Sequence, residues 1–494
     1  MSIADFGLPS FISSLAPKLL LIDGEWTPSA RGDVFESINP SNGKVLAKVA
    51  RGTETDIDRA VGAARRAFGS WSKVKPADRQ RILLRLADIV ERSAEELSVI
   101  DSLDMGAPIT RTRAAQRRWT TMIRYYAGLA TAIQGDQIQN SLPGNYLSYT
   151  ACEPIGVVGG ITPWNGPMVT TIWKVVPALA AGCTVVLKPS EEACLSALRF
   201  GELAMEAGVP PGAVNIVPGF GDAGSALAIH PDVDKVCFTG STETGQAILR
   251  ASAGNFKRVT LELGGKSPDI VFADADLDKA VAGAAMAVFA NSGQICSAGT
   301  RLFVERSIYD EFVHRVAEFG RGLKLGDSLD PTTDLGPLVS KRQLDRVCGY
   351  LDIAAAEGVH VLSGGGRLTQ GALRDGFYLA PTVLTEVKDS MRIAREEIFG
   401  PVVVAFPFDD VDEVIARGND TIFGLGSGVW TRNLSTAHRV AAGLRAGSVW
   451  VNCWQTQDPA IPFGGFKRSG IGRESGRNHI EAFLETKSVV VNLD

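Results

Sequence analysis

The stretch Pro154-Ile155-Gly156-Val157-Val158-Gly159-Gly160-Ile161 opens the pattern that decides the fold. From this point, short runs of apolar and β-branched residues alternate with segments of helical periodicity. Such short apolar runs are typical of strands that are buried on both faces, and strands with helices between them predict a parallel sheet. The first set of expected strands comprises residues 184–187, 213–217, 236–238, 258–261 and 269–272.

The same alternation returns in the second half of the chain. The expected strands there are residues 301–304, 359–362, 402–406, 426–429 and 448–452. We therefore predict an α/β fold with two doubly wound parallel-sheet domains that join near Gly264. Ahead of the first sheet, apolar residues recur at helical spacing over residues 56–68 and 76–100, which predicts surface helices.

Two expected strands stand apart from both sheets. Residues 146–151 and the terminal residues 487–492 are rich in β-forming side chains, and neither has an obvious hairpin partner nearby in the sequence. Lone strand edges of this kind often pair with a second subunit. We therefore expect a small β oligomerisation element and a homodimer or homotetramer.

Composition excludes nucleic acid and metal as expected partners. The 494 residues are 45% hydrophobic and 21% charged, which is typical of a globular chain with two or three domains. The net charge is -5, and acidic and basic residues are mixed throughout, so no basic stripe suggests nucleic acid. The five histidines lie far apart, and the seven cysteines show no C-x-x-C spacing, so we expect no metal site.

The same features predict a cytoplasmic protein. Scattered, odd-numbered cysteines argue against a disulfide framework and suit a reducing compartment. The first residues lack the basic region and apolar core of a signal peptide. The longest strongly apolar stretch, residues 280–290, is about half of what a bilayer span requires, so we expect no membrane partner.

Two glycine-rich segments carry groups for covalent chemistry. Cys296 lies in Gly293-Gln294-Ile295-Cys296-Ser297, and Glu262 lies in Leu261-Glu262-Leu263-Gly264-Gly265-Lys266. A thiolate can add to a carbonyl group, and a carboxylate can then activate a water that releases the product. A single cysteine beside glycine and serine is ordinarily a small buried hydrophobe, so the pair gains meaning only from its context.

Two glycine-framed turns compete as a phosphate-binding loop. Gly219-Phe220-Gly221-Asp222-Ala223-Gly224 fits the G-x-G-x-x-G pattern between a strand and a helix, which alone is weak. Gly240-Ser241-Thr242-Glu243-Thr244-Gly245 adds hydroxyl groups to the free amides of a helix start, which suits an anion better. A plain N-capped turn explains the second loop equally well.

Several motifs in order resemble one family over essentially the whole chain, from Ile22-Asp23-Gly24-Glu25-Trp26 to the last strand. The chain resembles the NAD(P)-dependent aldehyde dehydrogenase superfamily, of the hydrolytic type that does not acylate coenzyme A. The motifs are Thr162-Pro163-Trp164-Asn165, Leu187-Lys188-Pro189-Ser190-Glu191, the Gly240 to Gly245 loop, the segments around Glu262 and Cys296, Glu397-Ile398-Phe399-Gly400-Pro401, and Asn452 followed by Pro462-Phe463-Gly464-Gly465.

The resemblance implies a domain division and catalytic roles. Residues 1–133 and 151–263 form an NAD-binding domain, residues 264–463 a catalytic domain, and residues 134–150 and 480–494 the oligomerisation element. Cys296 is the nucleophile, Glu262 is the base for hydrolysis, and the Asn165 amide with the Cys296 N–H forms the oxyanion hole. Family members that acylate coenzyme A lack the carboxylate, so Glu262 favours hydrolysis.

The resemblance also implies contacts to the cofactor. Lys188 and Glu191 contact the adenosine ribose, and Glu191 favours NAD over NADP because a carboxylate repels a 2′-phosphate, although Lys188 weakens this preference. The remaining cofactor positions are Ser241 at the pyrophosphate, Trp164 near that loop, Glu397 and Phe399 around the nicotinamide ribose, and Gly221, Gly240, Gly245 and Leu263.

A small-molecule aldehyde is the expected substrate. Many relatives place a large aromatic residue immediately after the oxyanion asparagine, where this chain has Gly166. Missing bulk at Gly166 and Ala290 predicts a wide tunnel and a bulky aromatic, terpenoid or long-chain aldehyde. No charged anchor is evident at the expected substrate positions, which disfavours betaine aldehyde or succinic semialdehyde. These positions are Gly166, Thr170, Trp173, Ile295, Ser297, Gln455 and Phe463.

Two other classes of function use the same residues. A redox-free cysteine acyltransferase or hydrolase would use Cys296 but would normally need a histidine base, and no histidine lies near either motif. A structural or binding protein on the same scaffold would tolerate damaged motifs, whereas the nucleophile, base and oxyanion donor are intact here.

Overall fold

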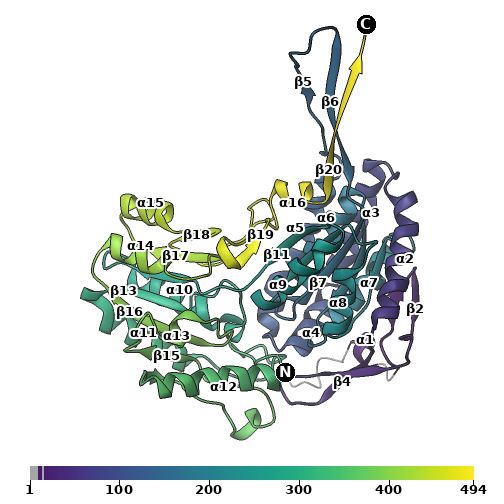
Figure 1. Ribbon diagram of the computed structural model, residues 1–494. Helices are drawn as coiled ribbons and strands as arrows, with labels where there is room; N and C mark the ends of the chain where they lie inside the picture. Colours follow the sequence, from purple (N-terminus) through teal and green to yellow (C-terminus); the bar gives the residue numbers. More distant parts are fainter. Residues whose placement is uncertain (1–8, 14–15) are drawn as a thin grey trace.

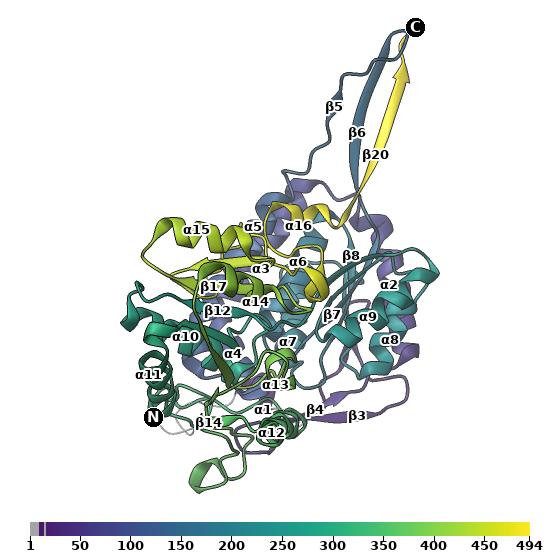
Figure 2. The ribbon, with the colours of Figure 1, turned by 60° about the vertical axis from the view of Figure 1, so that its left-hand side comes forward.

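The computed structural model describes residues 9–13 and 16–494. It has two lobes, each built on a large sheet, and a narrow arm that projects away from both of them (Figures 1 and 2). A separate two-stranded ribbon, β3 (Val34–Ile38) with β4 (Val45–Ala50), lies beside the first lobe.

The first sheet has eight strands, of which the central five are parallel. Antiparallel strands complete both of its edges. In spatial order its strands are β19 (Gly470–Ile471), β11 (Arg258–Glu262), β10 (Lys235–Thr239), β7 (Val157–Thr162), β8 (Thr184–Pro189), β9 (Val214–Ile216), β1 (Leu20–Ile22) and β2 (Glu25–Thr27).

Helices bury both faces of this sheet. Val157 and Val186 pack with α2, α8 and α9, whereas the adjacent Val158 and Val185 pack into the core formed with α3 to α7. Because successive side chains point to opposite faces, both must be apolar, which explains the continuous apolar runs. The helices are α2 (Glu54–Trp71), α3 (Pro76–Arg92), α4 (Ala94–Met105), α5 (Ile109–Leu129), α6 (Pro167–Ala181), α7 (Leu195–Glu206), α8 (Gly221–Ile229) and α9 (Thr242–Ala251).

The second sheet has seven strands, all parallel to their neighbours except β14 at one edge. The order is β14 (His360–Ser363), β15 (Thr382–Thr385), β16 (Val402–Phe408), β13 (Arg301–Glu305), β12 (Pro268–Val271), β17 (Gly426–Trp430) and β18 (Ser448–Val451). Its helices are α10 (Leu277–Phe289), α11 (Tyr309–Gly322), α12 (Lys341–Ala356), α13 (Arg392–Arg395), α14 (Val411–Asn419) and α15 (Leu434–Gly443). The strands expected from the sequence are present in both sheets, with boundary shifts of a few residues.

The expectation of surface helices over residues 76–100 is wrong in its second part. The chain turns at Ser93, which ends α3 and begins α4. Nearly every side chain of α4 is buried, because α4 packs against α5 and α7 inside the first lobe. Apolar spacing could not reveal this, since it continues through the turn with little change.

The two apparently lone strands pair with each other. β6 (Tyr146–Pro154) and β20 (Leu484–Asn492) are antiparallel over their whole length, and β5 (Gln137–Ile138) flanks β6. These three strands form the arm, with the short helix α16 (Arg477–Glu481) at its base (Figure 2). The partner of β20 lies far away in the sequence, which is why local patterns could not identify it. The outer edge of β20 pairs with no other strand in the described part of the chain.

The chain passes from the first sheet to the second between Glu262 and Pro268, close to the expected junction at Gly264. It then returns, because β19 pairs with the edge strand β11. The predicted domain boundaries remain predictions. In the described residues, no helix is long and apolar enough to cross a membrane, and no group of three or more His, Cys, Asp or Glu side chains is placed to hold a metal ion.

Candidate active site

A cavity of about 910 Å³ lies at the carboxyl ends of the parallel strands of the first sheet. Its wall includes Thr162 at the end of β7, Lys188 in β8 and Thr239 at the end of β10. Doubly wound sheets bind ligands at this edge. Segments of the second lobe, including residues 342–350 and 395–399, complete the wall, so the cavity lies between the two lobes.

The three predicted catalytic residues, Cys296, Glu262 and Asn165, all line this cavity. So do the predicted cofactor positions Trp164, Lys188, Glu191, Gly221, Gly240, Ser241, Leu263, Glu397 and Phe399. Gly245 does not line it. A Cβ atom at Gly245 would lie 2.6 Å from a methyl group of Leu263, so Gly245 allows the helix to pack against that side chain.

The two candidate phosphate loops border the same cavity and therefore do not compete. Helix α9 starts after Ser241, whose Oγ accepts a hydrogen bond from the Thr244 N–H at 3.2 Å. Helix α8 starts at Gly221, where an added Cβ would meet no atom within 4 Å. Helix starts present free N–H groups and a positive dipole end, which suit a pyrophosphate.

The two glycines after Glu262 allow three functional segments to approach one another. A Cβ at Gly264 would overlap with the Glu397 carboxylate, and a Cβ at Gly265 would overlap with the Cys296 carbonyl oxygen. The Gly265 N–H donates to Glu397 Oε1 at 3.1 Å. The glycine pair therefore determines how closely the nucleophile loop and Glu397 pack against the strand that carries Glu262.

The loop before Cys296 has an unusual backbone. Asn291, Ser292 and Gly293 are consecutive left-handed residues with φ of 54°, 53° and 72°. Each such non-glycine residue costs about 1–3 kcal/mol and persists only when its surroundings hold it. Here the Asn291 Nδ2 donates to the Asn165 carbonyl at 3.3 Å and the Ser292 Oγ to the Gly336 carbonyl at 2.6 Å.

Asn165 is tied to the same loop. Its Nδ2 donates to the Gln294 carbonyl at 2.9 Å, and the side chain is half-buried at the cavity wall. A side-chain amide has two N–H groups, so one remains for an oxygen in the cavity. This geometry suits an oxyanion donor that is held rigidly relative to Cys296.

Cys296 is half-buried, and its thiol is protonated at neutral pH in this conformation. Burial, together with the carboxyl groups of Glu397 and Glu262, raises the pKa of Cys296 to about 12. Formation of a thiolate therefore requires that its proton be removed as the reaction begins.

Glu262 is 3% exposed, and neither of its carboxyl oxygens has a hydrogen-bond partner among the described residues. Burial raises the pKa of Glu262 well above its ordinary value, and the nearby Glu474 carboxylate adds to this shift. Lys174 and Arg473 act in the opposite direction.

Lys174 and Glu474 form a fully buried ion pair beside Glu262, and sequence reasoning did not select either residue. They lie 300 positions apart. One signal was available, because Lys174 is the only charged residue in the otherwise apolar helix α6, and a lysine in such a helix requires a buried partner.

A second cavity of about 410 Å³ contains the predicted substrate residues Trp173 and Phe463. Their rings stack at 6.0 Å between centroids and 11° between planes. Cys296 packs against the same apolar cluster. Arg118 also lines this cavity, although it is not among the predicted substrate positions, none of which is charged.

The other predicted substrate positions line neither cavity. The Thr170 hydroxyl donates to the Gly166 carbonyl at 2.9 Å, so it serves the first turn of α6. The Gln455 Nε2 donates to the Ser297 Oγ at 3.0 Å. Ile295, next to Cys296, is half-buried. The assignment of these five residues to the substrate stays a prediction.

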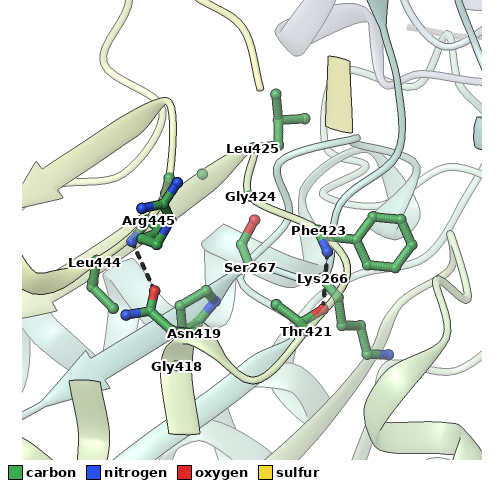
Figure 3. Close-up of a pocket in the computed structure, with 13 residues that line it drawn as sticks. Lys266, Ser267, Gly418, Asn419, Thr421, Phe423, Gly424, Leu425, Leu444 and Arg445 are labelled. Atoms are coloured by element: carbon green, nitrogen blue, oxygen red, sulfur yellow. Dashed lines mark hydrogen bonds between the residues drawn. The ribbon is translucent and has the colours of Figure 1, made fainter. Parts of the chain in front are cut away.

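Lys266 follows the glycine pair and is 1% exposed, with no hydrogen-bond partner for its Nζ among the described residues. Burial, together with repulsion from Arg301, lowers the pKa of Lys266 to about 7. Lys266 borders a cavity of about 10 Å³, and its amine points away from it (Figure 3). That volume is about the size of one water molecule, so this cavity is not a substrate site.

Comparison with known proteins identifies the family. The profile of the aldehyde dehydrogenase family matches residues 26–489. The chain belongs to this family. An aldehyde dehydrogenase of Enchytraeus buchholzi is 48% identical over 482 residues, which cover 96% of this chain and 95% of that protein.

Solved aldehyde dehydrogenase structures share the fold. The NAD⁺ complex of an aldehyde dehydrogenase from Bacillus cereus has a TM-score of 0.95 and 46% identity, and the match covers 98% of each chain. A betaine aldehyde dehydrogenase from Staphylococcus aureus in complex with NAD⁺ has a TM-score of 0.96 and 39% identity, covering 98% of this chain and 96% of that one. The resemblance seen in the motifs and the predicted α/β fold are confirmed.

Proposed function

We propose that this aldehyde dehydrogenase uses NAD to oxidise an aldehyde to a carboxylic acid, through a thioester on Cys296. One observation carries the proposal: Cys296, Glu262 and Asn165 line a single cavity with the start of helix α9 and the carboxylates of Glu191 and Glu397. The NAD⁺-bound relative from Bacillus cereus supports the choice of cofactor.

The cavity residues fit a dinucleotide. The open space at Gly221 and the helix start at Ser241 suit the pyrophosphate, and Glu191 with Lys188, 3.5 Å away, suits the adenosine ribose. The Glu191 carboxylate favours NAD over NADP, while Arg342, 3.8 Å from Glu191, reduces the selectivity. When bound, NAD supplies a hydride acceptor. Glu397 and Phe399 are proposed to orient the nicotinamide end.

The first stage is oxidation on the thiol. After the thiol gives up its proton to solvent water, Cys296 Sγ forms a bond to the aldehyde carbon, and the carbonyl electron pair moves onto oxygen. The free N–H of the Asn165 amide and the Cys296 N–H stabilise this oxyanion, and one such donor is typically worth about 3 kcal/mol. The oxygen then re-forms its double bond, the C–H bond breaks, and its electron pair leaves as hydride, so that a thioester remains.

The second stage is hydrolysis. Glu262 in its ionised form takes a proton from a water molecule, whose oxygen attacks the thioester carbonyl. The C–S bond breaks, the carboxylic acid leaves, and the proton that Glu262 took from water passes to Sγ, which regenerates both the thiol and the base. Lys174 and Glu474 are proposed as positioning residues that set the pKa of Glu262, because they are the charged groups that act on its carboxyl most strongly.

Absorbance of NADH, followed with an aldehyde and NAD, tests this proposal. Cys296→Ala is expected to abolish turnover, whereas Glu262→Gln is expected to give one burst of NADH and an acyl-enzyme that mass spectrometry detects. Cys348→Ala, a half-buried cysteine in α12, is the matched control and should retain activity. Absence of NADH with every aldehyde would overturn the function, and steady turnover by Glu262→Gln would overturn the role of the base.

Three finer assignments belong to the proposal. The aromatic walls of the 410 Å³ cavity support an apolar or bulky aldehyde, whereas the relative from Staphylococcus aureus is named for betaine aldehyde. The arm, with residues 134–150 and 480–494 as an oligomerisation element, supports a homodimer or homotetramer. The separate cofactor and catalytic domains and the cytoplasmic location stay predictions from the sequence.

A further inference from the structure

Arg118 is a cation without an anionic partner. It lies in helix α5 and is half-buried at the wall of the 410 Å³ cavity. Its guanidinium group lies over the ring of Trp173, 5.0 Å from the centroid. Across residues 9–13 and 16–494, the Arg118 side chain makes no hydrogen bond or ion pair, although arginine offers five N–H donors.

The charged groups around Arg118 do not balance its positive charge. Burial, together with repulsion from Arg111, lowers the pKa of Arg118 to about 10, so the group is still charged at neutral pH. The acidic residue on this cavity wall, Asp458, is exposed and accepts a hydrogen bond from the Ala460 N–H at 2.8 Å. A half-buried charge without a partner is unfavourable, and an anionic ligand would relieve this cost.

Arg118 lies close enough to Cys296 for the two groups to interact electrostatically. The Arg118 guanidinium lies over one face of the Trp173 ring, and the Trp173 ring stacks on the ring of Phe463. Both rings belong to the large apolar core of the first lobe, and Cys296 packs against the same core. Stacking on one face of the guanidinium leaves its edge N–H groups free, and this edge matches a carboxylate with two parallel hydrogen bonds.

We propose that Arg118 is a specificity-determining residue that binds a carboxylate at the far end of the aldehyde substrate. The substrate class is then an aldehyde with an apolar middle, which lies against Trp173 and Phe463, and an anionic tail. This inference rests on the proposed function. It also separates this chain from a betaine aldehyde dehydrogenase, because Arg118 repels a cationic tail.

Matched aldehydes test the proposal. Rates of NADH formation are measured with para-carboxybenzaldehyde against para-methylbenzaldehyde, with straight-chain aldehydes that end in a carboxylate against those that end in a methyl group, and with betaine aldehyde. The wild-type protein is expected to favour the carboxylated member in at least one pair by about tenfold in kcat/KM, and to use betaine aldehyde least. Arg118→Gln should remove this preference by raising KM for the carboxylated aldehyde about 10- to 100-fold.

The neutral aldehydes serve as the internal control, because their kcat/KM should change less than about threefold in Arg118→Gln. Arg117→Gln, an exposed neighbour on the same helix, should leave every rate unchanged, and Arg118→Lys should restore part of the preference. An equal loss for neutral and carboxylated aldehydes would overturn the proposal, since Arg118 would then act on Cys296 or on folding. No preference in any pair would also overturn it, while NADH formation would still support the proposed function.

Discussion

Glu262 is the residue whose surroundings control the second half of the proposed reaction. A carboxyl group that is buried, lacks hydrogen-bond partners and lies near another carboxylate holds its proton to unusually high pH. A general base works only when it is ionised. Hydrolysis of the acyl-enzyme should therefore accelerate as pH rises through the raised pKa of Glu262, well above the ordinary value of 4.5.

Changing the charges next to Glu262 should move this pH profile in opposite directions. Glu474→Gln removes a like charge and leaves Lys174 unpaired, so the pKa of Glu262 falls and the rising limb shifts to lower pH. Arg473→Gln removes an opposing positive charge, so the limb shifts to higher pH. Rapid-quench measurement of hydrolysis against pH records both shifts.

Glu481→Gln, an exposed glutamate in α16, is the control for this experiment and should leave the profile in place. Because Glu474→Gln breaks a buried ion pair, it is expected to cost about 3–5 kcal/mol of stability. The Arg473→Gln profile therefore provides the independent check. If both variants moved the limb in the same direction, the electrostatic account of Glu262 would be wrong.

At the level of elements, the glycine pair after β11 sets the distance between the base and the nucleophile. Gly265→Ala would place a Cβ against the carbonyl oxygen of Cys296 and displace the nucleophile loop. A shift of about 1 Å can cost about 100-fold in rate, so we expect a loss of that size in kcat/KM. Gly128→Ala, at an exposed position of α5 with no atom within 4 Å of the new Cβ, should leave activity intact and stabilise the helix by about 0.5–1 kcal/mol. Full activity of Gly265→Ala would show that the nucleophile loop can accommodate the added Cβ, and it would contradict this role of the glycine pair.

The sequence was most informative about individual elements and least informative about contacts between distant segments. Most strands of the two sheets follow from apolar runs, since burial on both faces leaves a clear local signature. Strand β15 and the short strands β1, β2 and β19 were not predicted. The turn at Ser93 left no such signature. Lys174 with Glu474, Arg118 with Trp173, and β6 with β20 depend on folding that joins remote segments, and no local pattern encodes these pairs.

At the scale of the whole molecule, the arm presents a surface that suits a second subunit. The outer edge of β20 pairs with no strand among the described residues, and Val490 and Val491 on it are 56% and 37% exposed. Free edges and exposed apolar side chains favour association. Val490→Asp should therefore lower the mass measured by sedimentation relative to the wild-type protein. Val34→Asp, on an exposed strand outside the arm, should not. A monomeric wild-type protein would contradict the proposed homodimer or homotetramer.

Because residues 470–471 return to the edge of the first sheet, the chain cannot simply be divided into two independent fragments at the junction between the sheets. A fragment that stops at Leu263 would retain the residues that surround the adenosine end of the cofactor, yet it would expose the backbone of the strand that ends in Glu262. The Leu263 N–H would lose its acceptor, the Ser469 carbonyl. When isolated halves are mixed in solution, catalysis should return only if the second half includes residues 464–476. This segment pairs with the strand that carries Glu262 and so holds the base in place.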